Sequence, residues 1–218
     1  MDELELKSGM EIRYLGQSGF QLSKDGSSIV IDPFDRKSGD LVGEVVYCTH
    51  GHPDHVGGIP TFLDRNPGAV LVANEQVAGQ FKRYSDRRMI AQDGGTYRHG
   101  DWEFQFIEAR HGFLRDINIG VVVRNGEESF GHLGDTITYE GFSSTKVDTL
   151  AVPITGVVTT SPSQAIGELK KFEKPLPTIV VMHWVFRNPK SFCRRLLSEF
   201  PEQSASSQRR VSYFPSKS

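Results

Sequence analysis

The sequence lacks the features that mark secreted and membrane-spanning proteins. Only two of its 218 residues are cysteine, and Cys48 and Cys193 lie far apart, which suits a reducing compartment better than a disulfide scaffold. No apolar run approaches the roughly 18 residues of a membrane-spanning helix, and residues 119–123 form one of the longest runs. Residues 1–5 are acidic where a signal peptide would be basic and then apolar. We therefore expect a cytoplasmic protein with no membrane partner.

The sequence also lacks an excess of charge of one sign. Lys and Arg total 25 against 27 Asp and Glu, which gives a formal net charge of −2. Proteins that bind nucleic acids usually carry a basic excess, so the composition argues against a nucleic acid partner. The 37% hydrophobic content is that of an ordinary globular protein. At about 150 residues per domain, the length predicts a single domain over residues 1–218.

Short apolar runs alternate with helix-like stretches, which predicts an α/β protein. The apolar and β-branched runs predict strands at residues 10–15, 20–22, 28–32, 44–49, 69–73, 97–98, 102–109, 117–124, 129–133, 150–154 and 178–182. Helical patterns predict helices at residues 74–84, 161–172 and 189–200, and one more that begins near Asp54. Near the C-terminus we expect a loose surface loop at 202–208 and an edge strand at 209–214. This alternation suggests two sheets, each covered by helices.

Residues 49–58, with the sequence Thr-His-Gly-His-Pro-Asp-His-Val-Gly-Gly, carry the strongest chemical signal. They place His50, His52, Asp54 and His55 within six positions, directly after a predicted strand. Neutral imidazoles and carboxylates are preferred ligands of zinc and similar divalent metals. On an extended segment His50 and His52 can point to the same side, while Asp54 and His55 can face a second position where a helix begins. One metal needs fewer ligands than this stretch supplies, so the motif predicts two.

Three further candidate ligands each follow a predicted strand: His111, Asp135 and His183. The carboxyl ends of strands commonly present functional groups along one edge of a sheet. Taken singly, each residue could have an ordinary structural role, and Asp135 could be a plain turn or cap residue. Together with the motif, they would complete two metal sites. Of the two remaining histidines, we interpret His99 as a turn residue and His132 as a strand residue near the site.

Six segments of the chain resemble the metallo-β-lactamase superfamily. The matching segments are 14–20 (Tyr-Leu-Gly-Gln-Ser-Gly-Phe), 31–33 (Ile-Asp-Pro), 50–58, 134–136 (Gly-Asp-Thr), 153–156 (Pro-Ile-Thr-Gly) and 182–184 (Met-His-Trp). They are most similar to the short metal-dependent hydrolases related to ascorbate-6-phosphate lactonase. The resemblance implies an αββα sandwich of four layers with the metals at one edge. It also implies ligand sets, namely His50, His52 and His111 for one metal, Asp54, His55 and His183 for the other, and Asp135 as a bridge.

The resemblance further implies hydrolysis of a small ester, lactone, thioester or phosphoester by a metal-bridging hydroxide. Asp54 would orient the nucleophile and pass a proton to the leaving group. Two divalent ions are expected as cofactors, with zinc or manganese favoured, and iron is also compatible with a His/Asp shell that lacks thiolate. Asp32 either supports the ligand loop from behind or simply ends its strand. We interpret Cys48 as a small buried hydrophobic residue.

Three alternative functions stay open. A nuclease acting on RNA or DNA would use the same two-metal chemistry, but the chain is short and its net charge of −2 gives no attraction for a polyanion. A non-hydrolytic iron oxygenase is the second alternative, and a metal-bound protein without turnover is the third. The substrate-binding residues are unknown, although we expect loops 114–118 and 184–190 to set specificity.

Overall fold

Two β-sheets of seven strands each dominate the computed structural model, which describes residues 3–6, 9–112, 117–184, 187–203 and 211–213. The first sheet runs in chain order: β1 (Glu3–Glu5), β2 (Glu11–Gly16), β3 (Gly19–Lys24), β4 (Ser27–Ile31), β5 (Val45–Cys48), β6 (Val70–Ala73) and β7 (Arg88–Ile90). The second sheet has the order β14-β13-β12-β11-β10-β9-β8. Its strands are β8 (Thr96–His99), β9 (Trp102–Glu108), β10 (Ile119–Asn125), β11 (Glu128–His132), β12 (Thr149–Pro153), β13 (Thr178–Met182) and β14 (Val211–Tyr213).

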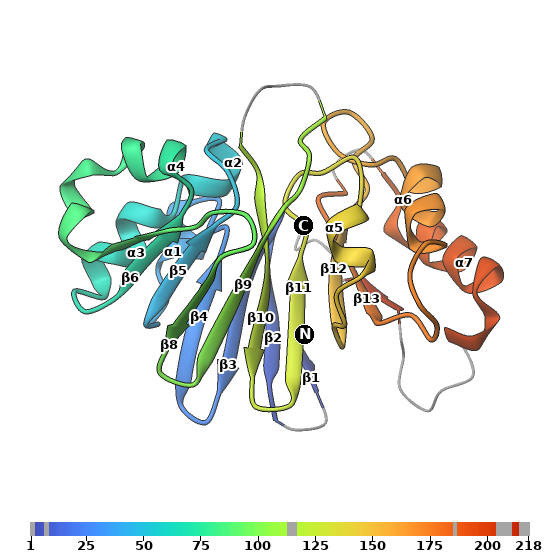
Figure 1. Ribbon diagram of the computed structural model, residues 1–218, viewed down its shortest axis with the longest axis horizontal. Coiled ribbons are helices and arrows are strands. Elements are labelled where there is room, and N and C mark those ends of the chain that lie inside the picture. The colour runs from blue at the N-terminus through green and yellow to red at the C-terminus, as the bar shows by residue number, and fades with distance from the viewer. Residues whose placement is uncertain (1–2, 7–8, 113–116, 185–186, 204–210, 214–218) are drawn as a thin grey trace.

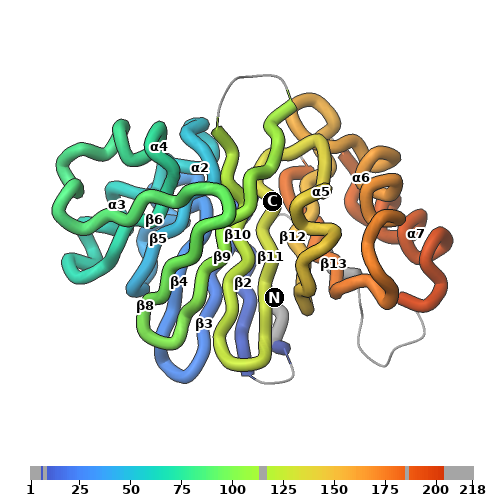
Figure 2. Tube along the Cα trace, viewed as in Figure 1, coloured from blue at the N-terminus to red at the C-terminus, as the bar shows by residue number. Residues whose placement is uncertain are grey.

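Helices cover the outer faces of the two sheets (Figure 1). On one side lie α1 (Arg36–Gly39), α3 (Ile59–Arg65), α4 (Glu75–Gln80) and the 3₁₀ helix η1 (Lys82–Arg87). On the other side lie α5 (Glu140–Ser143), α6 (Pro162–Leu169), α7 (Pro189–Glu199) and the 3₁₀ helix η2 (Pro201–Gln203). Figure 2 shows that the first half of the chain builds one sheet with its helices and the second half builds the other. This four-layer arrangement confirms the αββα sandwich that the sequence predicts.

The alternation of side chains along the strands explains the layers. In β5, Val45 and Tyr47 belong to the core between the sheets, whereas Val46 and Cys48 pack into a second core under α3 and α4. Because successive residues of a strand point to opposite faces, both faces of this strand must be apolar. The hydroxyl group of Tyr47 donates a hydrogen bond of 2.7 Å to the carbonyl of Ile119, which ties the two sheets together.

The strand directions bring many strand ends to one edge of the molecule. The strands β4, β5 and β6 are parallel to one another, as are β11, β12 and β13. Since β2 and β4 are both antiparallel to β3, and β9 and β11 are both antiparallel to β10, the ends of β2 and β9 reach this edge too. The short helix α2 (Pro53–Val56) lies there, at the top of the sheets in Figure 1.

The structure differs from the predicted elements in several places. It adds β1, α1 and α5, and it has two helices, α2 and α3, where one beginning near Asp54 was predicted. The helix predicted over residues 74–84 ends at Gln80, because Phe81 leaves the helical conformation (φ −114°, ψ 47°), and a 3₁₀ helix and the unpredicted strand β7 follow. The start of the loop predicted over 202–208 is packed, since Gln203 is buried and donates to the carbonyl of Leu176, while residues 204–208 lie outside the described residues. In the edge strand predicted at 209–214, residues 211–213 form β14, and the others are outside the described part.

None of the helices in the described part of the chain combines the length and the hydropathy that crossing a membrane requires.

Candidate metal centre

All seven predicted ligands come together at the edge where the strands end. His50, His52, Asp54 and His55 follow β5, and the last two lie in helix α2, which begins at Pro53 with His52 as its N-cap residue. His111 follows β9, Asp135 follows β11, and His183 directly follows β13. Proline is favoured in the first turn of a helix, so Pro53 helps to turn the chain sharply between His52 and Asp54.

The first group of candidate ligands consists of His50, His52, His111 and Asp135, whose ligand atoms lie within 4.8 Å of one another. Nε2 of His50 is 3.0 Å from Nδ1 of His52. The ring of His111 has its centre 5.2 Å from that of His50 and 5.0 Å from that of His52. Three imidazoles and one carboxylate thus lie close enough together to be ligands of one ion.

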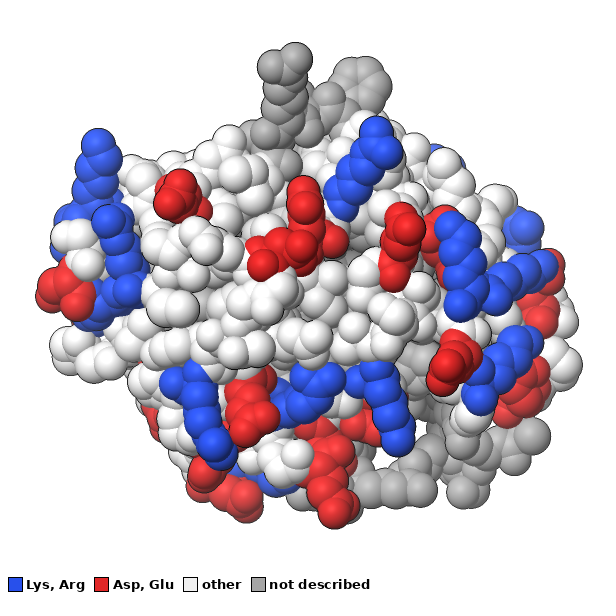
Figure 3. Space-filling model, in the orientation of Figure 1, with Lys and Arg blue, Asp and Glu red and all other residues white. Residues whose placement is uncertain are grey.

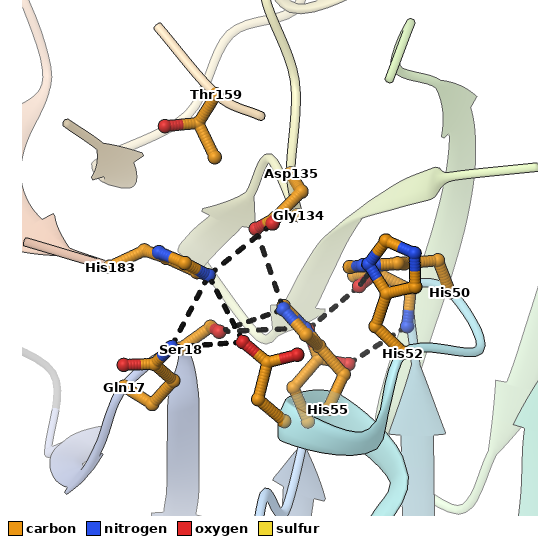
Figure 4. Close-up of polar contacts among 12 residues, drawn as sticks. Gln17, Ser18, His50, His52, His55, Gly134, Asp135, Thr159 and His183 are labelled. Atoms are coloured by element: carbon orange, nitrogen blue, oxygen red, sulfur yellow. Dashed lines mark hydrogen bonds and ion pairs between the residues drawn. The ribbon is translucent and has the colours of Figure 1, made fainter. Parts of the chain in front are cut away.

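The second group consists of Asp54, His55 and His183, again with ligand atoms within 4.8 Å of one another. Asp135 adjoins this group as well, because its Oδ1 lies 3.4 Å from Nε2 of His55 and its Oδ2 lies 3.3 Å from Nε2 of His183. Figure 4 shows the labelled side chains of His55 and His183 converging on Asp135. The carboxylate of Asp135 therefore stands between the two groups.

Asp32 lies behind the ligand loop and is fully buried. One of its carboxylate oxygens accepts a hydrogen bond from the amide of Thr49 at 2.8 Å, and the other accepts one from the Thr49 hydroxyl at 2.7 Å. The second oxygen also lies 2.7 Å from Nδ1 of His55. These contacts hold the start of the ligand loop and the ring of His55 in place, which is more than the end of a strand requires.

Burial and neighbouring charges set the protonation of this cluster. Burial, and after it the charge of His55, lower the pKa of His50 to about 3, so the His50 ring is neutral at neutral pH. For His55, burial opposes the charged form, but the carboxylates of Asp32 and Asp135 raise its pKa well above 6.5. Burial would raise the pKa of Asp135, yet the nearby His55 and His183 hold it below its usual range.

The residues present fit a bound divalent metal. Among the described residues, Oδ1 of Asp135 is buried without a hydrogen-bond partner, and it has only the ion-pair contact with Nε2 of His55 at 3.4 Å, so a bound cation would satisfy it better. The donor set is all imidazole and carboxylate, the chemistry that zinc, manganese and iron accept. Cys48 is outside this set, since its buried thiol contacts the carbonyl of His50 at 3.2 Å and burial raises its pKa well above 9.0.

No individual role follows from the sequence for Gln17, Ser18 or Thr155, although they lie in segments 14–20 and 153–156, which carry the resemblance. Ser18 lies 3.3 Å from Nε2 of His55, and Thr155 contacts Nδ1 of His183 at 2.5 Å. The side chain of Gln17 contacts Asp54 and His183. His132, interpreted from the sequence as a strand residue near the site, is fully buried and lies 2.8 Å from the carbonyl of Ser18. These contacts join segments that are distant in sequence, so local spacing gave no signal for them.

The two loops expected to set specificity are described only in part. Residues 113–116 and 185–186 lie outside the described residues. His99, which we interpret from the sequence as a turn residue, is instead the last residue of β8. Its Nε2 lies 3.8 Å from a carboxylate oxygen of Glu44, and it is not among the seven candidate ligands.

Curated sequences with similarity to this chain share a common description. A UPF0173 metal-dependent hydrolase from Thermus thermophilus is 28% identical over 178 residues, covering 74% of this chain and 78% of its own length. A protein of the same description from Bacillus cereus strain G9842 is 26% identical over 214 residues, covering 86% of this chain and 93% of its own length.

Solved structures with the same fold include a metallo hydrolase and a diiron hydroxylase. Igni18, a metallo hydrolase from Ignicoccus hospitalis, superimposes with a TM-score of 0.74 at 22% identity, covering 87% of this chain and 91% of its own. CmlA, a diiron β-hydroxylase from Streptomyces venezuelae, has a TM-score of 0.67 at 14% identity, covering 89% of this chain and 52% of its own. A family model described as the β-lactamase superfamily domain matches residues 11–181, well over half of the sequence. With its His/Asp cluster and its αββα layers, the chain belongs to the metallo-β-lactamase superfamily.

Proposed function

We propose that this protein is a hydrolase with two divalent metal ions, acting on a small ester, lactone, thioester or phosphoester. One observation carries the proposal: Asp135 belongs to the first group of imidazole and carboxylate donors, and its two oxygens lie 3.4 Å and 3.3 Å from His55 and His183 of the second group. His50, His52 and His111 would hold one ion, and Asp54, His55 and His183 the other. The relatives described as metal-dependent hydrolases support the reaction class.

Bound divalent ions would supply Lewis acidity and lower the pKa of a coordinated water. The chain's own residues orient the reaction. The side chain of Asp54 is 44% exposed, whereas those of His183 and Asp135 are almost completely buried, so Asp54 faces the open side of the centre. A hydrogen bond from His183 is the main cause that holds the pKa of Asp54 well below its usual range. An ionised Asp54 can accept a hydrogen bond from the attacking water and direct that water toward the substrate.

A small-molecule substrate fits the surface better than a polyanion. On the face in Figure 3, Lys and Arg side chains are interspersed with Asp and Glu side chains, and the net charge of the chain is −2. A nuclease gains affinity by neutralising phosphates with clustered basic side chains. This distribution of charge therefore favours the small-molecule reading over RNA or DNA.

The test combines metal analysis with a panel of lactones, thioesters and phosphodiesters. We expect about two equivalents of zinc or manganese per chain, turnover of at least one substrate class, and loss of both properties in His52→Ala and Asp135→Ala. His99→Ala is the matched control and should behave as the parent, because His99 lies outside the candidate ligand groups. Turnover that survives both ligand changes would contradict the proposal. Bound iron with oxygen uptake and no hydrolysis would favour an oxygenase instead.

A further inference from the structure

Gln17 occupies the turn between β2 and β3 in a backbone conformation that residues other than glycine seldom adopt. Its φ is +54°, although Gly16 and Gly19 stand in the same turn. Among the described residues, the other non-glycine residues with positive φ are Asp25, Asp32 and His183. Asp25 precedes Gly26 in the hairpin between β3 and β4, where such a conformation is common. The other three surround the candidate metal centre, and backbone strain that persists in a folded protein clusters at functional sites.

The side chain of Gln17 points at the second group of candidate ligands (Figure 4). Its Nε2 donates a hydrogen bond of 2.9 Å to Oδ2 of Asp54, and the same nitrogen is 3.4 Å from Nε2 of His183. The backbone of Gln17 is used as well, since its carbonyl accepts hydrogen bonds from the amide of His183 at 2.8 Å and from the Tyr14 hydroxyl at 2.7 Å. One turn residue thus contacts both Asp54 and His183.

Asp54 needs such a contact more than His183 and Asp135 do. Its side chain is 44% exposed, whereas that of His183 is 6% exposed and that of Asp135 is 2% exposed. The protein interior packs around buried side chains and fixes their rotamers, but an exposed aspartate is free to change rotamer. Within the described residues, the side chains at hydrogen-bond or ion-pair distance from the Asp54 carboxylate are those of Gln17 and His183.

An amide suits this task chemically. It carries no charge at any ordinary pH, so it donates a hydrogen bond to Asp54 without placing a positive charge beside a bound cation. Groups that orient a metal ligand from outside the coordination shell typically raise metal affinity by about 10- to 100-fold. The left-handed conformation of Gln17 places its side-chain amide at hydrogen-bond distance from Asp54. This contact accounts for the strained backbone.

We propose that Gln17 is a positioning residue, whose amide holds the Asp54 carboxylate in the orientation that the second metal ion requires while its backbone carbonyl holds His183. The inference rests on the two-metal centre of the proposed function but not on any substrate. It assigns a role to a residue outside the seven candidate ligands, and it makes the turn between β2 and β3 part of the metal centre.

The first test measures the affinity for zinc by competition with a chromogenic chelator. Gln17→Met keeps the length of the side chain and removes its hydrogen bond, so we expect the weaker of the two zinc affinities to fall about tenfold or more. Gln21→Met is the matched control on β3, because in the described part of the chain the Gln21 amide donates to the carbonyl of Val42 at the exposed surface. Equal zinc affinity in Gln17→Met and the parent would overturn the proposal.

A second variant separates positioning from folding. Gln17→Gly removes the side chain and relieves the left-handed backbone, so its melting temperature in the presence of a chelator should equal or exceed that of the parent. Its zinc affinity should nevertheless fall as in Gln17→Met. A fall in both melting temperature and affinity would assign Gln17 a merely structural role in the turn and would contradict the proposal.

A double-mutant cycle tests whether Gln17 acts through Asp54. In an Asp54→Asn background, Gln17→Met should change the zinc affinity by less than about threefold, because residues that act together are not additive. A further tenfold loss in that background would show that Gln17 acts on something else. A parent that binds two zinc ions but hydrolyses no probe contradicts the proposed function alone, whereas a parent that binds one ion overturns both proposals.

Discussion

Nδ1 of His55 lies 2.7 Å from a carboxylate oxygen of Asp32, and both side chains are completely buried. With Nδ1 occupied in this way, the other ring nitrogen of His55 is directed at Asp135, 3.4 Å away. A histidine whose second nitrogen contacts a carboxylate is fixed in ring orientation and becomes a more basic ligand. In the proposed centre, Asp32 would therefore orient His55 without itself being a ligand.

Removing the charge of Asp32 should damage both the fold and the metal centre. Asp32→Asn leaves the buried, protonated ring of His55 without its closest counter-charge, and breaking one partner of a buried pair costs about 3–5 kcal/mol. We expect this loss in the free energy of unfolding, measured with urea in the presence of a chelator. The zinc affinity should fall about 10- to 100-fold.

Asp40→Asn is the control for this change. The side chain of Asp40 is 61% exposed and pairs with Arg65 at the surface, where ion pairs contribute at most about 1 kcal/mol. Its unfolding curve and zinc affinity should match those of the parent. If Asp32→Asn also matches the parent, Asp32 merely ends its strand.

The stability of the metal-free protein should depend on pH in a direction that His55 and Asp32 set. The pKa of His55 is raised well above 6.5 in the folded state, so its contribution is fully present below pH 6.5 and is lost as the pH rises through the folded value. Burial opposes ionisation of Asp32, but His55 holds its pKa below 3.8, so its contribution is present above pH 3.8 and is lost on acidification. The contribution of this pair should therefore be largest between pH 3.8 and 6.5. Burial lowers the pKa values of His50 and His132, so these two residues make the folded state less stable as the pH falls below 6.5.

Urea titrations at several pH values with a chelator present would check this dependence. Replacing His55 by Gln should remove the decline on the alkaline side, because the variant has no ring to deprotonate. A metal-free parent whose stability increases steadily from pH 6 to pH 9 would contradict the assignment of a raised pKa to His55.

Adding metal should stabilise the protein and abolish this alkaline decline. A ligand imidazole must be neutral, so the ion displaces the proton from His55 and binds more tightly as the pH rises. A free metal concentration of 100 times the dissociation constant adds about 2.7 kcal/mol for one site. For a chain of this size, this stabilisation corresponds to a rise of roughly 5–10 °C in the melting temperature. The measurement compares the metal-free protein, freed of chelator, before and after zinc is added. Asp135→Ala should show little of this rise, since it lacks the carboxylate between the two groups.

The sequence was sufficient to predict the seven candidate ligands because their signals are local. His50 to His55 form a compact motif after a strand, and His111, Asp135 and His183 each follow an apolar run whose end could be recognised. Whether the chain arranges them around two ions is the prediction that the metal analysis tests.

The supporting contacts could not be predicted in the same way. Gln17 reaches Asp54 only because the turn after β2 arrives at the same edge as α2, and Thr155 meets His183 only because β12 and β13 are neighbours. Such contacts depend on how the strands are ordered, which periodicity does not specify. The break at Phe81 has a similar origin, since Tyr84 beyond it is buried against α3 and tertiary packing there overrides helix propensity.

Gly134 offers a test of how tightly the loop before Asp135 is held. Its φ is +60°, and a Cβ atom added there would lie 2.2 Å from Oδ1 of Asn118 and 2.9 Å from Cβ of Thr49. The amide of Asn118 donates to the carbonyls of Ala109 at 2.9 Å and Leu133 at 3.2 Å, each two residues before a candidate ligand. Gly134→Ala should therefore displace Asn118 and with it both ligand loops.

We expect Gly134→Ala to lower the free energy of unfolding by about 1–3 kcal/mol, as overpacking does, and to weaken zinc binding as well. Gly167→Ala is the control, because Gly167 lies inside α6 with no atom within 4 Å of the added Cβ. In a helix interior, alanine is favoured over glycine by about 0.5–1 kcal/mol, so this variant should unfold at higher urea concentration with unchanged zinc affinity. If Gly134→Ala instead binds zinc as the parent does, zinc binding does not depend on the present conformation of the loop before Asp135. That result would contradict the role given to Asp135 between the two groups of ligands.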